Sequence, residues 1–409
     1  MEQAAIARRL EEALAQMQVI DCHEHLPPEA VRTGRRVDVF TLFSHYTGPD
    51  LMVAGMAQAD YQKIQDTDLP LDYRWQLFAP YWQQIRWNSY SRAALLAAQR
   101  CYGCDDISAA TYRKLSEAMQ KANTPGIYQR ILAETCNIRT SLTQCGRTET
   151  GTALLTPVMP LLYDMESWQG LTRSAAAAGA AIRSLDDYLD ACRAYVMRVK
   201  GEGAVGLKMA SNPYGDPDRE KAVEAFRALQ EGRQQHLPVP NPLRDFVLDQ
   251  LLAFAAEQDL VIAVHMGYWG DFRILAPSHM IPLLQRHPRT RFDLYHVGYP
   301  YVRESLMLGK TFPNAWLNFC WTHIISQKMA VDALDEAIDL VPSNKVLGFG
   351  GDYDKPVEKV YGHLAMARED IAAVLAGRVA QGRWSEEQAL AIARQWLWDN
   401  PRELYRLQV

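Results

Sequence analysis

The feature of this sequence that most constrains its fold is a repeated alternation of short apolar runs with longer segments of helical periodicity. The eight apolar runs cover residues 18–22, 137–143, 153–162, 204–209, 260–265, 291–296, 315–320 and 345–349. Such an alternation is typical of parallel strands joined by crossover helices. Eight units of this kind favour a closed α/β barrel, the (β/α)8 TIM-barrel fold, over an open sheet.

The connection between the first two predicted strands is far longer than an ordinary βα connection. It has about 110 residues, whereas a βα loop usually has about 2 to 6. Residues 27–125 are rich in aromatic side chains and arginine and have helical periodicity, so we expect helices that pack mainly on one another. An insertion after strand one lies at the carboxyl-terminal face of a barrel, where it can act as a lid. We therefore expect one domain over residues 1–409, with a helical insertion at 27–125.

Composition narrows the classes of function. The chain is 48% hydrophobic and 22% charged, with a net charge of −5, which is typical of a globular protein and unlike a polybasic nucleic-acid binder. The first twenty residues are unlike a signal peptide, and no apolar run reaches the roughly 18 residues of a membrane span. We expect a cytoplasmic protein that acts on a small molecule, without nucleic-acid or membrane partners; homo-oligomerisation stays open.

Two histidines stand at the end of the first predicted strand, in the segment VIDCHEHLPPEA. Side chains alternate between the faces of a strand, so His23 and His25 point to one side and Glu24 to the other. Two imidazoles at the mouth of a strand can reach one cation, and imidazole is a common ligand of zinc. Alone, this pair is a weak indication of a metal site.

Three later strands end on residues of matching chemistry. His265 ends the fifth predicted strand, His296 ends the sixth, and Asp352 follows the eighth. Because the carboxyl ends of barrel strands converge on one cavity, these residues and the first pair together predict a metal centre.

These motifs resemble the amidohydrolase superfamily of metal-dependent (β/α)8 enzymes. In detail, DCHEHLPPE resembles the strand-one motif of uronate isomerases. The stretch from WLNFCWTHIISQ to NKVLGFGGD resembles the amidohydrolase-related branch, which includes decarboxylases and lactonases. The resemblance runs from Val19 to about Asp354, and the later DNPRELY segment is similar to the closing helix of that branch.

The resemblance implies roles for individual residues. The implied metal ligands are His23, His25, His265 and Asp352, and Asp352 would also accept a proton from the attacking water. His296, the other residue assigned to catalysis, would bind a second metal or the substrate. We expect one divalent ion, zinc or else manganese, rather than two.

Further residues near the strand ends are candidates for binding an anionic substrate group. Lys208 stands near the end of strand four, where binuclear members of the superfamily place a carboxylated lysine; we expect an unmodified lysine that contacts substrate. Arg273 and His323 follow strands five and seven, and Arg86 or Arg92 of the insertion could add to the pocket. The remaining histidines stand away from strand ends and are expected at the surface: His45, His236, His279, His287 and His363.

These residues predict a metal-dependent hydrolase that cleaves a C–N or C–O bond of a small polar or anionic substrate. A sugar acid isomerase of the uronate isomerase kind, or a decarboxylase, could use the same site. A non-catalytic metal-binding barrel is the alternative from another class. The ligands alone do not choose among these reactions.

Overall fold

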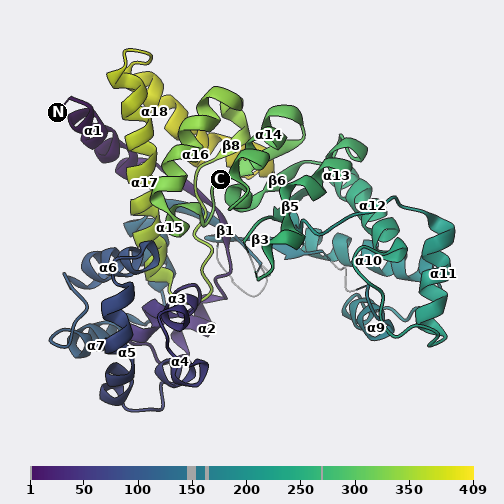
Figure 1. Ribbon diagram of the computed structural model, residues 1–409, viewed down its shortest axis with the longest axis horizontal. Helices are drawn as coiled ribbons and strands as arrows, with labels where there is room; N and C mark the ends of the chain where they lie inside the picture. Colours follow the sequence, from purple (N-terminus) through teal and green to yellow (C-terminus); the bar gives the residue numbers. More distant parts are fainter. Residues whose placement is uncertain (1, 145–152, 162–164, 269) are drawn as a thin grey trace.

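Eight parallel strands, most of whose residues are buried, form the centre of the protein (Figure 1). The computed structural model describes residues 2–144, 153–161, 165–268 and 270–409. The strands neighbour one another in chain order: β1 Val19–Glu24, β2 Ile138–Thr143, β3 Leu155–Pro160, β4 Gly206–Ala210, β5 Val261–His265, β6 Phe292–Leu294, β7 Ala315–Asn318 and β8 Val346–Leu347. A backbone hydrogen bond from Cys22 to the carbonyl of Phe349, 3.0 Å long, joins the first strand to the segment after the last. The predicted (β/α)8 barrel is confirmed.

Each predicted strand overlaps an observed one, and the differences lie at the ends. The strand expected over residues 291–296 stops at Leu294, because the chain turns there: His296 and Val297 have φ angles of 65° and 46°. The strand expected over residues 18–22 continues to Glu24. Leu162, the last residue of the third predicted strand, lies outside the described residues.

Helices surround the barrel, and the longest, α17, packs against α1, α6 and α16. None of the described helices is both long and apolar enough to cross a bilayer. The helices outside the insertion are α1 Glu2–Gln16, α9 Trp168–Ala177, α10 Leu185–Gly201, α11 Arg219–Gln230, α12 Pro242–Glu257, α13 Met280–Arg286, α14 Val302–Thr311, α15 Thr322–Ile325, α16 Gln327–Leu340, α17 Val357–Ala380, α18 Glu386–Arg394 and α19 Asn400–Tyr405.

The long connection after β1 folds into helices with a core of their own, drawn in purple and blue in Figure 1. Its α-helices are α2 Glu29–Thr33, α3 Thr47–Val53, α4 Gln58–Gln65, α5 Leu71–Ile85, α6 Ser89–Tyr102 and α7 Tyr112–Ala122. The rings of Phe43, Phe78 and Trp82 pack against one another within this core, with Phe43 4.6 Å from Phe78 and 5.0 Å from Trp82 between centroids. The extent of the insertion, residues 27–125, and its action as a lid stay predictions.

Candidate active site

Three side chains from three strand ends meet at one end of the barrel. One nitrogen or oxygen atom of each of His23, His296 and Asp352 lies within 4.8 Å of the other two, and all three residues are buried. His23 Nε2 is 3.0 Å from Asp352 Oδ1, and His296 Nε2 is 4.0 Å from Asp352 Oδ2. Imidazole nitrogens and a carboxylate are the donor atoms that zinc takes in catalytic sites.

Two further histidines flank this cluster. His25 Nε2 lies 3.2 Å from Asp352 Oδ1, and His265 Nδ1 lies 3.0 Å from His296 Nε2. The structure therefore brings together all five residues that the sequence nominated at the ends of strands one, five, six and eight. It sets His296, rather than His265, next to the carboxylate of Asp352.

The environment of Asp352 suits a cation. Its contacts with His23 and His25 lack hydrogen-bond geometry, and neither carboxylate oxygen has a hydrogen-bond partner among the residues that the structure describes. A buried carboxylate without donors is costly unless a cation compensates it. The residues present thus fit a divalent metal ion.

The buried histidines are held in the neutral form that binds metals. Burial, together with the charge of Lys208, takes the pKa of His23 well below its ordinary value and that of His265 to about 3. Burial and the neighbouring His265 lower the pKa of His296 as well. A neutral ring carries one unprotonated nitrogen, and that lone pair is what coordinates a metal.

The backbone around Asp352 explains how the carboxylate reaches the cluster. Its φ of 62° is left-handed, and its amide donates a 2.8 Å hydrogen bond to the carbonyl of His23. The preceding Gly351 packs so closely that a Cβ there would overlap the carboxylate of Glu24. Left-handed conformations are uncommon for residues other than glycine and collect at functional sites, and His296 adopts one too, with a φ of 65°.

Two buried carboxyl groups of β1 lie behind the ligands. Asp21 accepts hydrogen bonds from the amide of Gly351 at 3.0 Å, the amide of His23 at 3.3 Å and the hydroxyl of Ser141 at 2.8 Å. Glu24 accepts a 2.6 Å bond from the amide of Tyr353. Burial raises the pKa of Asp21 to about 6. This pair ties β1 to the loop that carries Asp352, and supports of this kind tune metal affinity.

A cavity of about 650 Å³ opens beside the cluster. His25, His265 and Asp352 reach it from the barrel, and Lys208 lines it as well. The Nζ of Lys208 lies 3.4 Å from the centre of the Tyr295 ring and has no hydrogen-bond partner in the described part of the chain. Burial lowers the pKa of Lys208 to about 8. This placement leaves its ammonium available to an anionic group.

The structure does not bring His323 and Arg273 to this cavity. His323 is fully buried, with Nδ1 2.8 Å from Asp370 and Nε2 3.1 Å from the carbonyl of Gly348, so both ring nitrogens are engaged. The side chain of Arg273 is 81% exposed and pairs with Asp271. The structure therefore gives no support to their assignment to substrate binding, because following a strand does not fix where a side chain points.

The arginines of the insertion that were candidates for the pocket are also engaged elsewhere. Arg86 forms an ion pair with Asp106, and Arg92 forms one with Glu369 of α17. Neither lines the cavity of the metal centre.

The sequence missed two residues that the insertion contributes. His45 and Tyr46 line the cavity, and the ring of His45 lies 6.3 Å from that of His25. No periodicity marks them, since they stand between a short 3-10 helix and α3. The expected surface position is thus wrong for His45, as it is for the buried His363 and His287. His236 is exposed, as expected, and His279 is partly buried.

The comparisons with solved structures agree with the barrel fold. Uronate isomerase from Thermotoga maritima superposes with a TM-score of 0.83 at 15% identity, over 98% of this chain and 97% of that one. Glucuronate isomerase from Caulobacter crescentus superposes with a TM-score of 0.81 at 19% identity, over 100% and 95%. At such identities the likeness establishes the fold.

A curated relative and a family give the sequence-level likeness. Protein fluG of Emericella nidulans is 27% identical over 206 residues, which are 48% of this chain and 24% of fluG. The matched segment is thus about a quarter of that relative's length. The family described as amidohydrolase matches residues 164–407, more than half of the chain. With its strand-end histidines and aspartate on a (β/α)8 barrel, the chain belongs to the amidohydrolase family.

Proposed function

We propose that the protein is a metal-dependent hydrolase that cleaves a C–N or C–O bond of a small anionic substrate. The observation that carries the proposal is the buried carboxylate of Asp352, faced by imidazoles from β1 and from the end of β6. His23, His25, His296 and Asp352 would hold one divalent ion, zinc or manganese, and His265 would complete or orient this set through His296.

When bound, such an ion would lower the pKa of water toward about 7 and polarise a substrate oxygen. Asp352 accepts the proton of the attacking water on a carboxylate oxygen and can return it to the leaving group. The rigid turn at Asp352 fixes the position of that oxygen. Lys208 binds the anionic part of the substrate, and His45 and Tyr46 form the wall of the cavity that the insertion supplies.

Isomerisation of a sugar acid is the second candidate. It is favoured by the likeness to two uronate isomerases over nearly the whole chain, insertion included. It is also favoured by His45 and Lys208, two titratable groups that line the cavity and are not among the proposed ligands. In that reaction one of them would move a proton between neighbouring carbon atoms while the other stabilises the oxygen that changes charge.

One mass measurement separates the reactions. The metal-loaded protein is incubated with a panel of lactones, amides and uronic acids, and the masses of the products are measured by mass spectrometry. Gain of one water supports hydrolysis. Unchanged mass with a new retention time would replace our proposal by isomerisation, and loss of carbon dioxide would replace it by decarboxylation.

The variant Asp352→Asn tests the assigned base. We expect it to lower kcat at least about a hundredfold, the usual range for loss of a general base, with the fold retained by circular dichroism. Turnover at the wild-type rate would remove Asp352 from the chemistry.

A further inference from the structure

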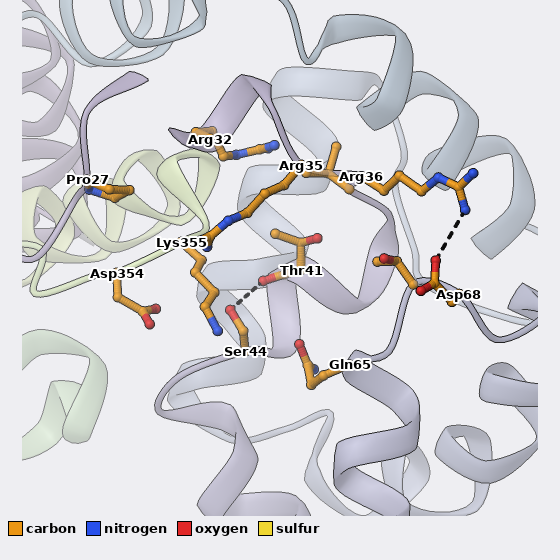
Figure 2. A pocket seen from close by; sticks show the side chains of 12 residues that line it. Pro27, Arg32, Arg35, Arg36, Thr41, Ser44, Gln65, Asp68, Asp354 and Lys355 are labelled. Atoms are coloured by element: carbon orange, nitrogen blue, oxygen red, sulfur yellow. Dashed lines mark hydrogen bonds and ion pairs between the residues drawn. The ribbon is translucent and has the colours of Figure 1, made fainter. Parts of the chain in front are cut away.

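A second cavity lies between the insertion and the loop after β8 (Figure 2). Its volume is about 470 Å³. Four cationic side chains and two anionic ones line it: Arg32, Arg35, Arg36, Lys355, Asp68 and Asp354. It is thus a basic pocket on a protein whose net charge is negative.

Two of these cations are paired with carboxylates of the protein, one in the interior and one at the surface. The buried guanidinium of Arg32 donates to Glu358 at 2.7 Å and to Asn123 at 2.7 Å. Arg36 lies 3.7 Å from Asp68. These pairs leave Arg35 and Lys355 as the cations of the pocket with no ion pair to any described residue.

Arg35 and Lys355 both line the pocket, one from the insertion and the other from the loop after β8. Figure 2 shows Arg35 extending toward the base of the Lys355 side chain, whose amine points on toward Ser44, whereas Arg36 extends the opposite way to Asp68. Two like charges that share a cavity repel each other, and an anion between them removes that repulsion. The arrangement therefore favours an oxyanion such as a carboxylate or phosphate.

The backbone that carries these two side chains is fixed. The carbonyl of Arg35 accepts a 2.8 Å hydrogen bond from the side chain of the buried Asn123, and its amide donates to the carbonyl of Arg32. The carbonyl of Lys355 accepts a 3.0 Å bond from the amide of Val357 at the start of α17. The two side chains are exposed, and the fixed backbone limits how far their charged ends can move.

The basic pocket adjoins the metal centre. Asp354 lines both cavities. On the insertion, Ser44 lines the basic pocket while the next two residues, His45 and Tyr46, line the cavity of the metal centre. The carboxylate of Asp354 would repel an anion at the junction, so the oxyanion belongs at Arg35 and Lys355 rather than between the two cavities.

We propose that Arg35 and Lys355 bind a distal carboxylate, or another oxyanion, of a substrate whose reacting group lies at the metal centre. The inference rests on the metal-dependent function proposed above and names its substrate class: small molecules with an anionic group at each end. Specificity for such molecules then comes jointly from the barrel and from the insertion.

Calorimetric titration of the metal-loaded protein tests this inference. The ligands are the unbranched dicarboxylates from succinate to suberate and monocarboxylates of the same lengths. A parallel series carries a phosphonate in place of the distal carboxylate. We expect one dicarboxylate length to bind at least about tenfold more tightly than its monocarboxylate, as one charged contact would give. A stronger preference for the phosphonate would identify that oxyanion instead, and it supports the pocket equally.

The double variant Arg35→Gln with Lys355→Gln should lose this preference while its metal content and its affinity for monocarboxylates stay unchanged. The matched control is Arg36→Gln, which removes a cation from the same pocket that already pairs with Asp68, and it should keep the preference. Absence of any preference in the wild-type protein, or its survival in the double variant, would overturn the basic pocket as a substrate site. If the wild-type protein still hydrolyses a panel substrate, only this inference fails; if it takes up no metal, the proposed function fails.

Discussion

Replacing Asp21 by alanine tests whether the metal ligands are held in place from behind. The carboxylate of Asp21 accepts hydrogen bonds from the amides of His23 and Gly351 and from the hydroxyl of Ser141. The first amide belongs to a ligand and the second to the residue before Asp352. Asp21→Ala removes all three acceptor contacts at once, without touching a ligand side chain.

The expected cost follows from the donors left unpaired. Each buried donor without a partner costs about 1–3 kcal/mol, and the Ser141 hydroxyl can rotate to another acceptor while the two amides cannot. We therefore expect the free energy of unfolding to fall by about 2–6 kcal/mol. Loss of such a support typically weakens metal binding by about 10–100-fold. Measurements at pH 8 lie above the pKa of about 6 that burial gives Asp21, so the wild-type carboxylate is ionised.

Urea denaturation gives the stability, and competition with a zinc chelator gives the metal affinity. The matched control is Asn314→Ala. Asn314 is buried and donates to the carbonyls of Leu284 and His287 at 3.1 and 2.9 Å, just before β7 and away from the ligands. It should lose comparable stability and keep the zinc affinity. If Asp21→Ala binds zinc as tightly as this control does, the reasoning is refuted.

Three further changes probe other parts of the structure. Gly351→Ala puts a Cβ against Glu24, so we expect it to lose about 1–3 kcal/mol of stability and to bind zinc more weakly; wild-type values for both would contradict this. Phe78→Ala should cost about 3–5 kcal/mol and speed hydrogen exchange across residues 27–125, while metal content stays unchanged because the ligands lie on the barrel; loss of metal would contradict that separation. Burial raises the pKa of Asp293 from 3.8 to about 7, so the folded protein holds this proton more tightly than the unfolded chain, and stability falls as pH rises through that window. The free energy of unfolding of Asp293→Asn should therefore rise by up to about 4 kcal/mol relative to that of the wild type between pH 4 and pH 7. A difference in unfolding free energy between the two proteins that stays constant over this pH range would refute the prediction.

The barrel and its cluster of ligands could be predicted from the sequence because both follow from local patterns. Buried parallel strands are apolar runs of characteristic length. Their carboxyl ends lie at one face of the barrel, whatever the length and conformation of the loops. This is why His23, His25, His265, His296 and Asp352 could be expected to meet, and the structure places them together. One detail differs from the prediction. His265 was expected as the ligand beside Asp352, but the left-handed turn at His296 brings His296 next to that carboxylate instead.

The residues that were missed or misplaced depend on tertiary packing. His45 reaches the cavity only because the insertion folds on its own core and packs α6 against α17. His323 follows a strand as the true cluster members do, yet Asp370 of α17 holds its ring away from the cavity. Arg273 finds a partner two residues away, in Asp271. A pattern of residues along the chain specifies none of these partners.

The central claim is that the ends of β1, β6 and β8 build a site for one divalent metal ion. The most direct measurement is metal analysis of protein purified without chelator, before and after incubation with zinc or manganese, for the wild type and for Asp352→Asn. We predict about one equivalent per wild-type chain and much less in the variant. A wild-type protein that contains no metal and takes up neither ion would contradict the claim.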